Sequence, residues 1–237
     1  MNRALLIWVM VLLTACQSAT STTINTSSQQ EQEERKMNRM NQQFIVSAGQ
    51  GDLKTVLSML EKGAELNAVD EYGRTAVMTA TYNNQVKMVE ALIQKGADLN
   101  IRDHNLNNVF LYAGAEGLLD IVKLAIEAGA DPALTNRYGG TALIPASERG
   151  HVETVEELLN HTEIDVNHIN NLHWTALLEA VILGDGGEKH QHIVKLLLQH
   201  GADPKIGDKN GITPLMHAKK MGFKDMAVLL EQAERER

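Results

Sequence analysis

TAVMTA, residues 75–80, decides the fold because close variants of it recur along the chain. The later copies are NVFLYA at 108–113, TALIPA at 141–146, TALLEA at 175–180 and TPLMHA at 213–218. The small residue that ends each copy, counted from Ser47 onward, recurs at intervals of 33, 33, 33, 34 and 38 residues. A fixed period of this length indicates an array of stacked structural units.

The sequence between these copies predicts two helices per unit. A Thr or Asn at the start of each copy can cap the free N–H groups of a first helix. In LLDIVKLAIEAGAD, residues 118–131, apolar side chains recur at helical spacing, and the Gly that follows can end a second helix. An Asp or Asn then opens each new unit and marks the turn of a projecting hairpin, at Asp70, Asp103, Asn136, Asn170 and Asp208.

These stretches resemble the ankyrin repeat, whose signature is T-P-L-H-x-A. The resemblance covers residues 41–233 and implies an all-α ankyrin solenoid of about six helix-turn-helix units with β-hairpin tips. A repeat domain over 37–237 is expected, with units near 41–69, 70–102, 103–135, 136–169, 170–207 and 208–233. The fifth unit carries an insertion, GDGGEKHQ at 184–191, which we interpret as a flexible loop.

The amino terminus, MNRALLIWVMVLLTACQ at 1–17, has the layout of a secretory signal peptide. Arg3 precedes an apolar run over 4–13 that is shorter than the roughly 20 residues of a membrane-spanning helix. LTAC, residues 13–16, resembles the lipobox of bacterial lipoproteins. This resemblance implies a signal peptide over 1–15, acylation of Cys16 with a group such as palmitate, and, with Gln17 next, sorting to the outer membrane. An ordinary signal peptide with a chance cysteine, or an uncut helical anchor, are the alternatives.

Residues 16–36 are predicted to form a disordered tether, since Ser, Thr, Gln and Glu dominate them and they contain too little apolar surface to fold. The expected location is therefore the cell envelope, with the domain lipid-anchored and facing the periplasm. MNRM at 37–40 repeats the MNR of residues 1–3, so an internal start there would give a minor cytosolic form. Coincidence is the alternative interpretation.

Composition and motifs argue against several classes of function. A net charge of −8 and an isoelectric point near 5.6 disfavour nucleic acids and anionic lipid surfaces as partners. With Cys16 the sole cysteine, a disulfide scaffold, a cysteine nucleophile and a thiolate zinc site are excluded. His190, His192 and His200 lack further ligands for a metal, and Glu148, Glu153, Glu156 and Glu157 are interpreted as a solvated helical face. We expect no enzyme, no cofactor and no metal site.

Ankyrin arrays bind proteins through their hairpin tips, the exposed face of their first helices and the concave groove between them, and the resemblance places partner-binding residues on the matching positions here. Tyr, Trp and Arg are also the residues most enriched in interface hot spots. Tyr112 is the aromatic exception, because it lies inside a first helix. The candidate partner-binding residues are Tyr72, Arg74, Tyr82, His104, Arg137, Tyr138, Arg149, Leu172, Trp174 and Lys209.

Two functions remain open on resemblance. The chain is similar to ankyrin-repeat lipoproteins encoded beside phospholipase effectors of type VI secretion systems, which implies an immunity protein that binds and neutralises such an effector. It is also similar to bacterial ankyrin proteins associated with catalases, which implies a periplasmic scaffold that supports a stress-resistance enzyme. The lipid anchor favours the immunity function, because it places an inhibitor at the surface that a lipase must reach.

Overall fold

The computed structural model describes residues 29–236, and the chain divides into two compact units, Met1–Gln43 and Phe44–Arg237. The expected signal peptide, Cys16 and the tether up to residue 28 lie outside the described residues. Between residues 29 and 236, no helix combines the length and apolar character needed to cross a membrane.

The described part of the first unit, residues 29–43, is helical. The structure thus has a helix at residues 29–36, where composition predicts a disordered tether. Gln, Glu, Arg and Lys have high helix propensity. Glu31 and Arg35 also form an ion pair at 3.6 Å with helical i,i+4 spacing, which supports the helix further.

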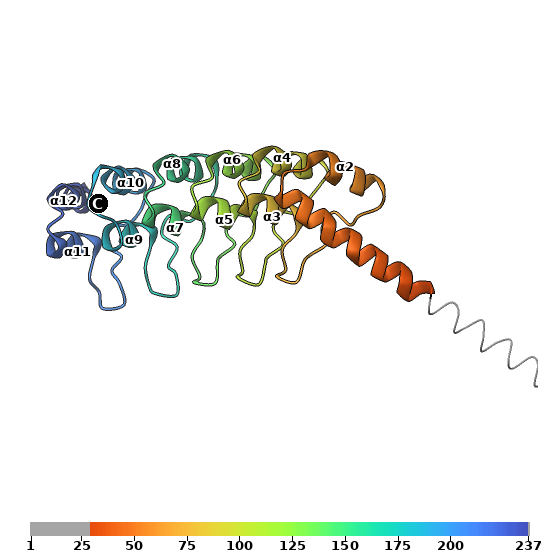
Figure 1. Ribbon diagram of the computed structural model, residues 1–237. Helices are drawn as coiled ribbons and strands as arrows, with labels where there is room; N and C mark the ends of the chain where they lie inside the picture. The colour runs from red at the N-terminus through yellow and green to blue at the C-terminus, as the bar shows by residue number, and fades with distance from the viewer. Residues whose placement is uncertain (1–28, 237) are drawn as a thin grey trace, which may run out of the picture. The chain divides into compact units, whose positions relative to one another are not determined.

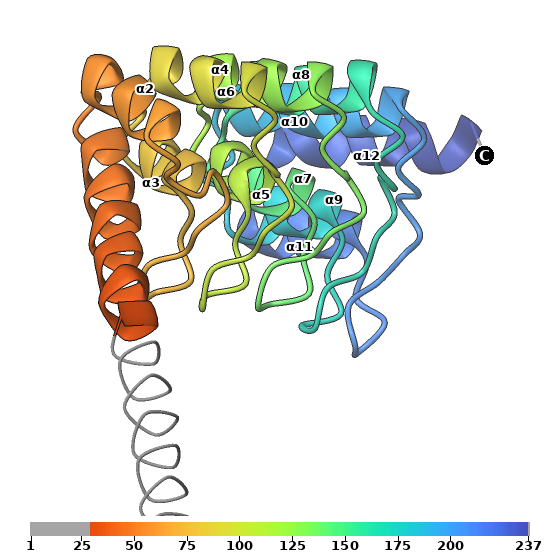
Figure 2. The same ribbon diagram turned by 90° about the vertical axis from the view of Figure 1, so that its right-hand side faces the viewer.

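The second unit stacks helix pairs in two layers (Figures 1 and 2). After a short helical segment at 44–49, the inner layer contains α3 (Ala76–Tyr82), α5 (Val109–Ala115), α7 (Leu143–Glu148), α9 (Ala176–Ile182) and α11 (Pro214–Met221). The outer layer contains α2 (Leu53–Glu61), α4 (Val86–Gln94), α6 (Leu119–Glu127), α8 (Val152–His161), α10 (Glu188–Gln199) and α12 (Lys224–Glu236). Loops project from the inner layer between successive pairs, as Figure 2 shows.

Small residues allow the inner helices to stack closely. The alanines that end the repeated copies (Ala80, Ala113, Ala146, Ala180 and Ala218) have no exposed surface. In the outer layer Val56, Val89, Val122, Val155 and Val194 are equally buried. No unit could bury these side chains alone, so stability comes from the contacts between neighbouring units.

The predicted helix caps are confirmed at four of the five copies. The side chains of Thr75, Asn108, Thr175 and Thr213 each accept a hydrogen bond from the backbone N–H three residues later, at 2.8–3.3 Å. Thr141 does not, and its buried hydroxyl has no hydrogen-bond partner among residues 29–236. In the fifth unit the backbone N–H of Glu179 donates to the carbonyl of Thr175, four residues earlier. Pro145 at the equivalent position has no N–H, and the carbonyl of Thr141 instead accepts from Ile144, three residues later, so this helix begins with a tighter turn.

The projecting loops are tight turns, and no strand occurs in residues 29–236. The expected β-hairpin tips are therefore not found there. The predicted opening Asp or Asn does mark each turn, because its Oδ1 accepts the N–H groups two and four residues later at all five positions. Those N–H groups are then not free to form a ladder of strand hydrogen bonds.

Candidate partner-binding groove

A groove with a volume of about 560 Å³ lies between the inner helices and the loops of the central units. It includes five of the ten sequence-predicted binding residues, namely Tyr82, Arg137, Tyr138, Arg149 and Leu172. The other lining residues are Asn105, Asn107, Tyr112, Ala115, Glu116, Asn136, Gly140, Ile144, Pro145, Glu148, Asn170, Glu179 and Leu183. The structure thus brings together residues from α3 to α9, nearly one hundred positions apart in the chain.

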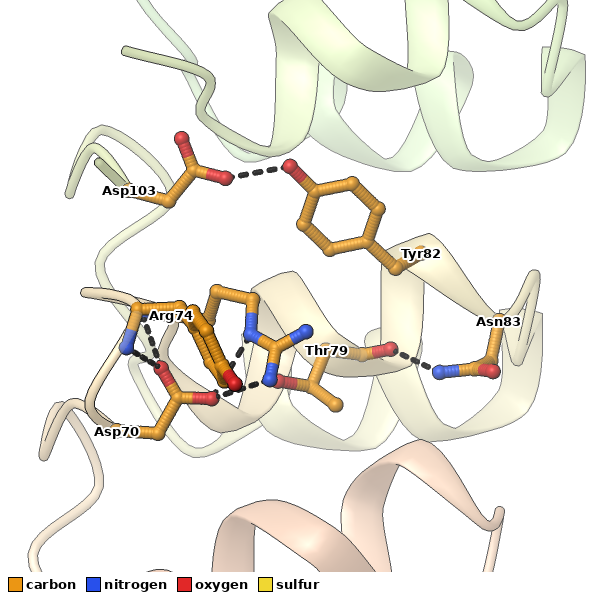
Figure 3. Close-up of polar contacts among 7 residues, drawn as sticks. Asp70, Arg74, Thr79, Tyr82, Asn83 and Asp103 are labelled. Atoms are coloured by element: carbon orange, nitrogen blue, oxygen red, sulfur yellow. Dashed lines mark hydrogen bonds and ion pairs between the residues drawn. The ribbon is translucent and has the colours of Figure 1, made fainter. Parts of the chain in front are cut away.

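Two tyrosines form one end of the groove. The rings of Tyr82 and Tyr112 lie with centroids 4.2 Å apart at 56°, and Tyr82 donates its hydroxyl hydrogen to Asp103 (Figure 3). Burial, followed by the hydrogen bond to Asp103, raises the pKa of Tyr82 to about 12, so the phenol remains a donor at neutral pH. Tyr82 is only partly exposed, and Tyr112, treated as the exception in the sequence, lines the same groove.

The loop side of the groove presents exposed apolar and aromatic surface. Tyr138 is 56% exposed and Leu172 is 52% exposed. The Arg137 guanidinium lies 4.8 Å from the centre of the Tyr138 ring and donates to Asn105 Oδ1 at 3.1 Å. Arg149 is held at the helix side by the Glu116 carboxylate and by the carbonyl of Ala115.

Glu179 is a buried charged residue of the groove that sequence reasoning missed. It is 4% exposed, and its Oε1 accepts a hydrogen bond from Asn170 Nδ2 at 2.7 Å. Burial raises the pKa of Glu179 to about 7, with a further contribution from the negative charge of Glu148. The sequence contained a signal, because Glu179 in TALLEA occupies the position of His217 in TPLMHA.

The remaining candidates lie outside this groove. Arg74 lies 4.5 Å from the ring centre of Tyr72 and pairs with Asp70 at 2.7 Å (Figure 3). Burial tends to raise the pKa of Asp70, but hydrogen bonds from Arg74 and Tyr72 prevail and lower it below 3.8. His104 and Lys209 are exposed and Trp174 is partly buried, none of them among the lining residues.

The histidines near the insertion form hydrogen bonds with different partners and do not gather into one site. His190 is buried, with Nδ1 at 2.8 Å from Asp185 Oδ1 and Nε2 at 2.9 Å from the carbonyl oxygen of Glu148. His200 Nε2 contacts Asn160 Oδ1 at 3.0 Å instead. Across residues 29–236, no three His, Cys, Asp or Glu residues are grouped to hold a metal ion.

The insertion is built into the stack and is not simply a flexible loop. Its last residues form the first turn of α10, which begins at Glu188. His190 then packs against Gly150 in the way that His151 packs against Gly117 one unit earlier. The insertion therefore extends the helix while the contact between units is kept.

The four glutamates that the sequence grouped do not share one face. Glu148 lines the groove from α7, whereas Glu153, Glu156 and Glu157 belong to α8 in the outer layer. Glu157 pairs there with Lys123 at 3.9 Å and with His161 at 3.1 Å. Glu148 therefore acts with Glu179 and not with its sequence neighbours.

Comparison with known proteins places the chain in a family. A family model described as ankyrin repeats (three copies) matches residues 12–103 and 110–208. The putative ankyrin repeat protein YahD of Escherichia coli K12 is 44% identical over 187 residues, which is 79% of this chain and 93% of that protein.

Two solved structures share the fold along most of their length. An ankyrin repeat domain from Acinetobacter baumannii AYE has a TM-score of 0.78 at 48% identity and covers 81% of this chain and 97% of its own. The ankyrin repeat protein EF0377 has a TM-score of 0.77 at 37% identity, with 80% and 96% coverage. The repeated sequence, the stacked helix pairs and these matches agree, and the chain belongs to the ankyrin repeat family.

Proposed function

We propose that this chain binds a partner protein in the central groove, and that the partner is a phospholipase effector delivered into the periplasm, which the chain neutralises as an immunity protein. The observation that carries the binding role is the exposure of Tyr138 and Leu172 beside a groove with several fixed polar groups. Exposed aromatic and apolar side chains next to oriented polar groups are typical of protein interfaces.

The mechanism requires no chemistry from this chain. A stable inhibitor needs to bury about 1,200–2,000 Å² in total over the effector's active-site entrance or lid. Tyr138 and Leu172 would supply the buried centre of the contact, and Arg137 and Arg149 the polar rim that steers encounter. Ankyrin arrays serve many partners, so the choice of a phospholipase rests on the resemblance to immunity lipoproteins and on the lipobox-like LTAC.

The proposed lipid anchor at Cys16 adds proximity. A domain attached to the outer membrane meets a lipid-degrading enzyme at a raised effective concentration, without any additional contact. Cys16→Ser should therefore release the protein from membranes and weaken protection at a normal expression level. Unchanged membrane fractionation of this variant would remove the anchor from the proposal and leave the binding role standing.

The deciding experiment is survival in competition. Cells lacking this chain are attacked by otherwise identical siblings that carry the secretion system, and are complemented with wild type or variants. Tyr138→Ala with Leu172→Ala should abolish protection. Val228→Ala is the matched control, because Val228 is 58% exposed but lies on the outer helix α12, outside the groove. Survival of the uncomplemented strain, with effector delivery verified, would contradict immunity and leave the scaffold function.

A further inference from the structure

Two carboxyl groups in the groove lack a positive partner. Glu179 is buried and accepts a hydrogen bond from the neutral amide of Asn170, and no ion pair to its carboxyl group occurs within residues 29–236. Glu148, on the neighbouring helix α7, makes no hydrogen bond or ion pair through its carboxylate in the same part of the chain. The two helices pack directly against each other, so the two negative charges repel one another inside the groove.

Other carboxylates around the inner layer are each satisfied by a donor. Asp103 accepts from the Tyr82 hydroxyl, Glu116 pairs with Arg149, and Asp208 lies 3.0 Å from His217 Nε2. A buried carboxylate is energetically costly unless it is paired. Glu179, which is buried, and Glu148, which is half-buried, differ from these carboxylates because no cationic side chain binds them within residues 29–236.

The positive groups nearby are already engaged. Arg149 is bound to Glu116 and to the Ala115 carbonyl, and Arg137 is held by Asn105 over the Tyr138 ring. His190 uses both ring nitrogens, one toward Asp185 and one toward the backbone of Glu148. None of these three side chains is free to neutralise the Glu148 and Glu179 carboxylates.

The walls around the two carboxylates suit a long cationic side chain. Leu172 and Leu183 are about half exposed, at 52% and 48%, and with Ile144 they line the same groove. Such apolar walls can cover the aliphatic stem of an arginine or lysine while its charged end reaches the carboxylates. The flat guanidinium of arginine carries five N–H donors and can bridge two carboxylates at once, which a lysine ammonium does less well.

We propose that the groove receives a cationic side chain of the partner protein, arginine before lysine, with Glu148 and Glu179 binding its charged end and Leu172 and Leu183 enclosing its stem. Asn170 is a positioning residue, because its amide fixes the Glu179 carboxyl from within the repeat array. This inference rests on the proposed binding role of the groove, and it names the chemistry that the partner must present.

The test uses a phage-displayed library of random 12-residue peptides selected on the immobilised full chain. We expect the selected peptides to be rich in arginine or lysine. Replacing that residue by citrulline or norleucine should weaken binding about 10-fold or more, since a buried charged contact is lost. Glu179→Gln and Glu148→Gln should each weaken binding to a similar extent, whereas Glu153→Gln, on the outer helix α8, should not.

The outcomes separate this inference from the proposed function. Peptides that lose binding to Tyr138→Ala with Leu172→Ala, yet bind Glu148→Gln and Glu179→Gln as well as wild type, would overturn the cation inference alone. Peptides indifferent to all of these variants, or a selection that yields no binder, would overturn the groove as a binding site. Circular dichroism verifies that each variant is folded, and Gln keeps the oxygen that accepts from Asn170.

Discussion

The fifth and the last units solve the same structural problem with opposite chemistry. In the last unit the opening Asp208 accepts from His217, nine residues later; in the fifth unit the opening Asn170 donates to Glu179 at the same separation. The loop residue is the acceptor in the last unit and the donor in the fifth, and a hydrogen bond joins the loop to the inner helix in both. The exchange leaves a carboxyl group in the groove where the other unit has an imidazole.

This comparison shows that the hydrogen bond between the opening residue and the inner helix is kept while the residue types that form it differ. The third unit offers another solution, since Asp103 receives the hydroxyl hydrogen of Tyr82 from the preceding helix. The hydrogen bond between the loop and the inner helix requires one donor and one acceptor, and either residue can supply either group. The charge of the side chain that faces the groove can therefore differ between units. In the fifth unit that charge is negative.

The largest loss of stability is expected when only one residue of the Asn170–Glu179 pair is replaced by its counterpart in the last unit. Asn170→Asp keeps the oxygen that closes the loop but removes the donor and sets a second carboxylate against Glu179. We expect a loss of about 2–4 kcal/mol in the free energy of unfolding at pH 8. Urea denaturation measures it, and Asp208→Asn in the last unit serves as the comparison. A loss below that of Asp208→Asn would contradict our account of the Asn170–Glu179 pair.

Replacing both residues of the pair should restore part of the stability lost with Asn170→Asp. Asn170→Asp combined with Glu179→His recreates in the fifth unit the pair formed by Asp208 and His217. We expect a favourable coupling free energy of about 1–3 kcal/mol in a double-mutant cycle, because the two side chains are in direct contact. Additive effects of the two substitutions would show that the units are not interchangeable at this position.

The two units should also respond to pH in opposite directions. The folded-state pKa of Glu179 is raised from 4.5 to about 7, so its contribution to stability is present below pH 4.5 and is lost as the pH rises through 7. Burial opposes, but hydrogen bonds from Ile212, Asn210 and His217 lower the pKa of Asp208, whose contribution is lost as the pH falls below 3.8. Glu179→Gln should therefore gain about 1–2 kcal/mol over wild type at pH 8 and nothing at pH 4.

Thermal unfolding of both proteins across pH 4 to 8 measures this difference. The helices that pack against α9 also carry the ionisable side chains of Glu148 on α7, His190 on α10 and His217 on α11, so wild type and Glu179→Gln are compared at each pH. Parallel curves would contradict the raised pKa of Glu179.

The smallest effect is expected in the third unit. Tyr82→Phe leaves one oxygen of the Asp103 carboxylate without its donor but does not add a charge. We expect a loss of about 1 kcal/mol in the free energy of unfolding, since solvent at this partly exposed site replaces some of the lost hydrogen bond. Tyr72→Phe, at an exposed ring, is the control. Equal stability of the two variants would mean that the Tyr82–Asp103 bond contributes nothing.

Much of the array was accessible from the sequence. The period, the paired helices, the buried alanines and the turn-forming Asp or Asn depend on residue type at fixed short spacing, and they were confirmed. Two of the differences from the expected local structure have local causes. Charged and amide side chains made residues 29–36 helical, and Pro145 prevented Thr141 from capping its helix.

The groove could be predicted only in part. Tyr138, Leu172, Arg137 and Arg149 were found because their repeat positions face outward in any ankyrin array. Trp174 was expected on the same surface but is partly buried and does not line the groove.

By itself, the sequence determined the period of the array and the pairing of its helices, because these follow from local propensity and from apolar residues at regular spacing. Only the tertiary structure decided which charges meet. Glu148 and Glu179 come from different units, and their proximity depends on how far α9 lies over α7 when the units stack. The structure likewise assigned Tyr82 to Asp103 and Nε2 of His190 to the backbone carbonyl of Glu148, since a hydrogen bond between units depends on register and distance that no single repeat contains.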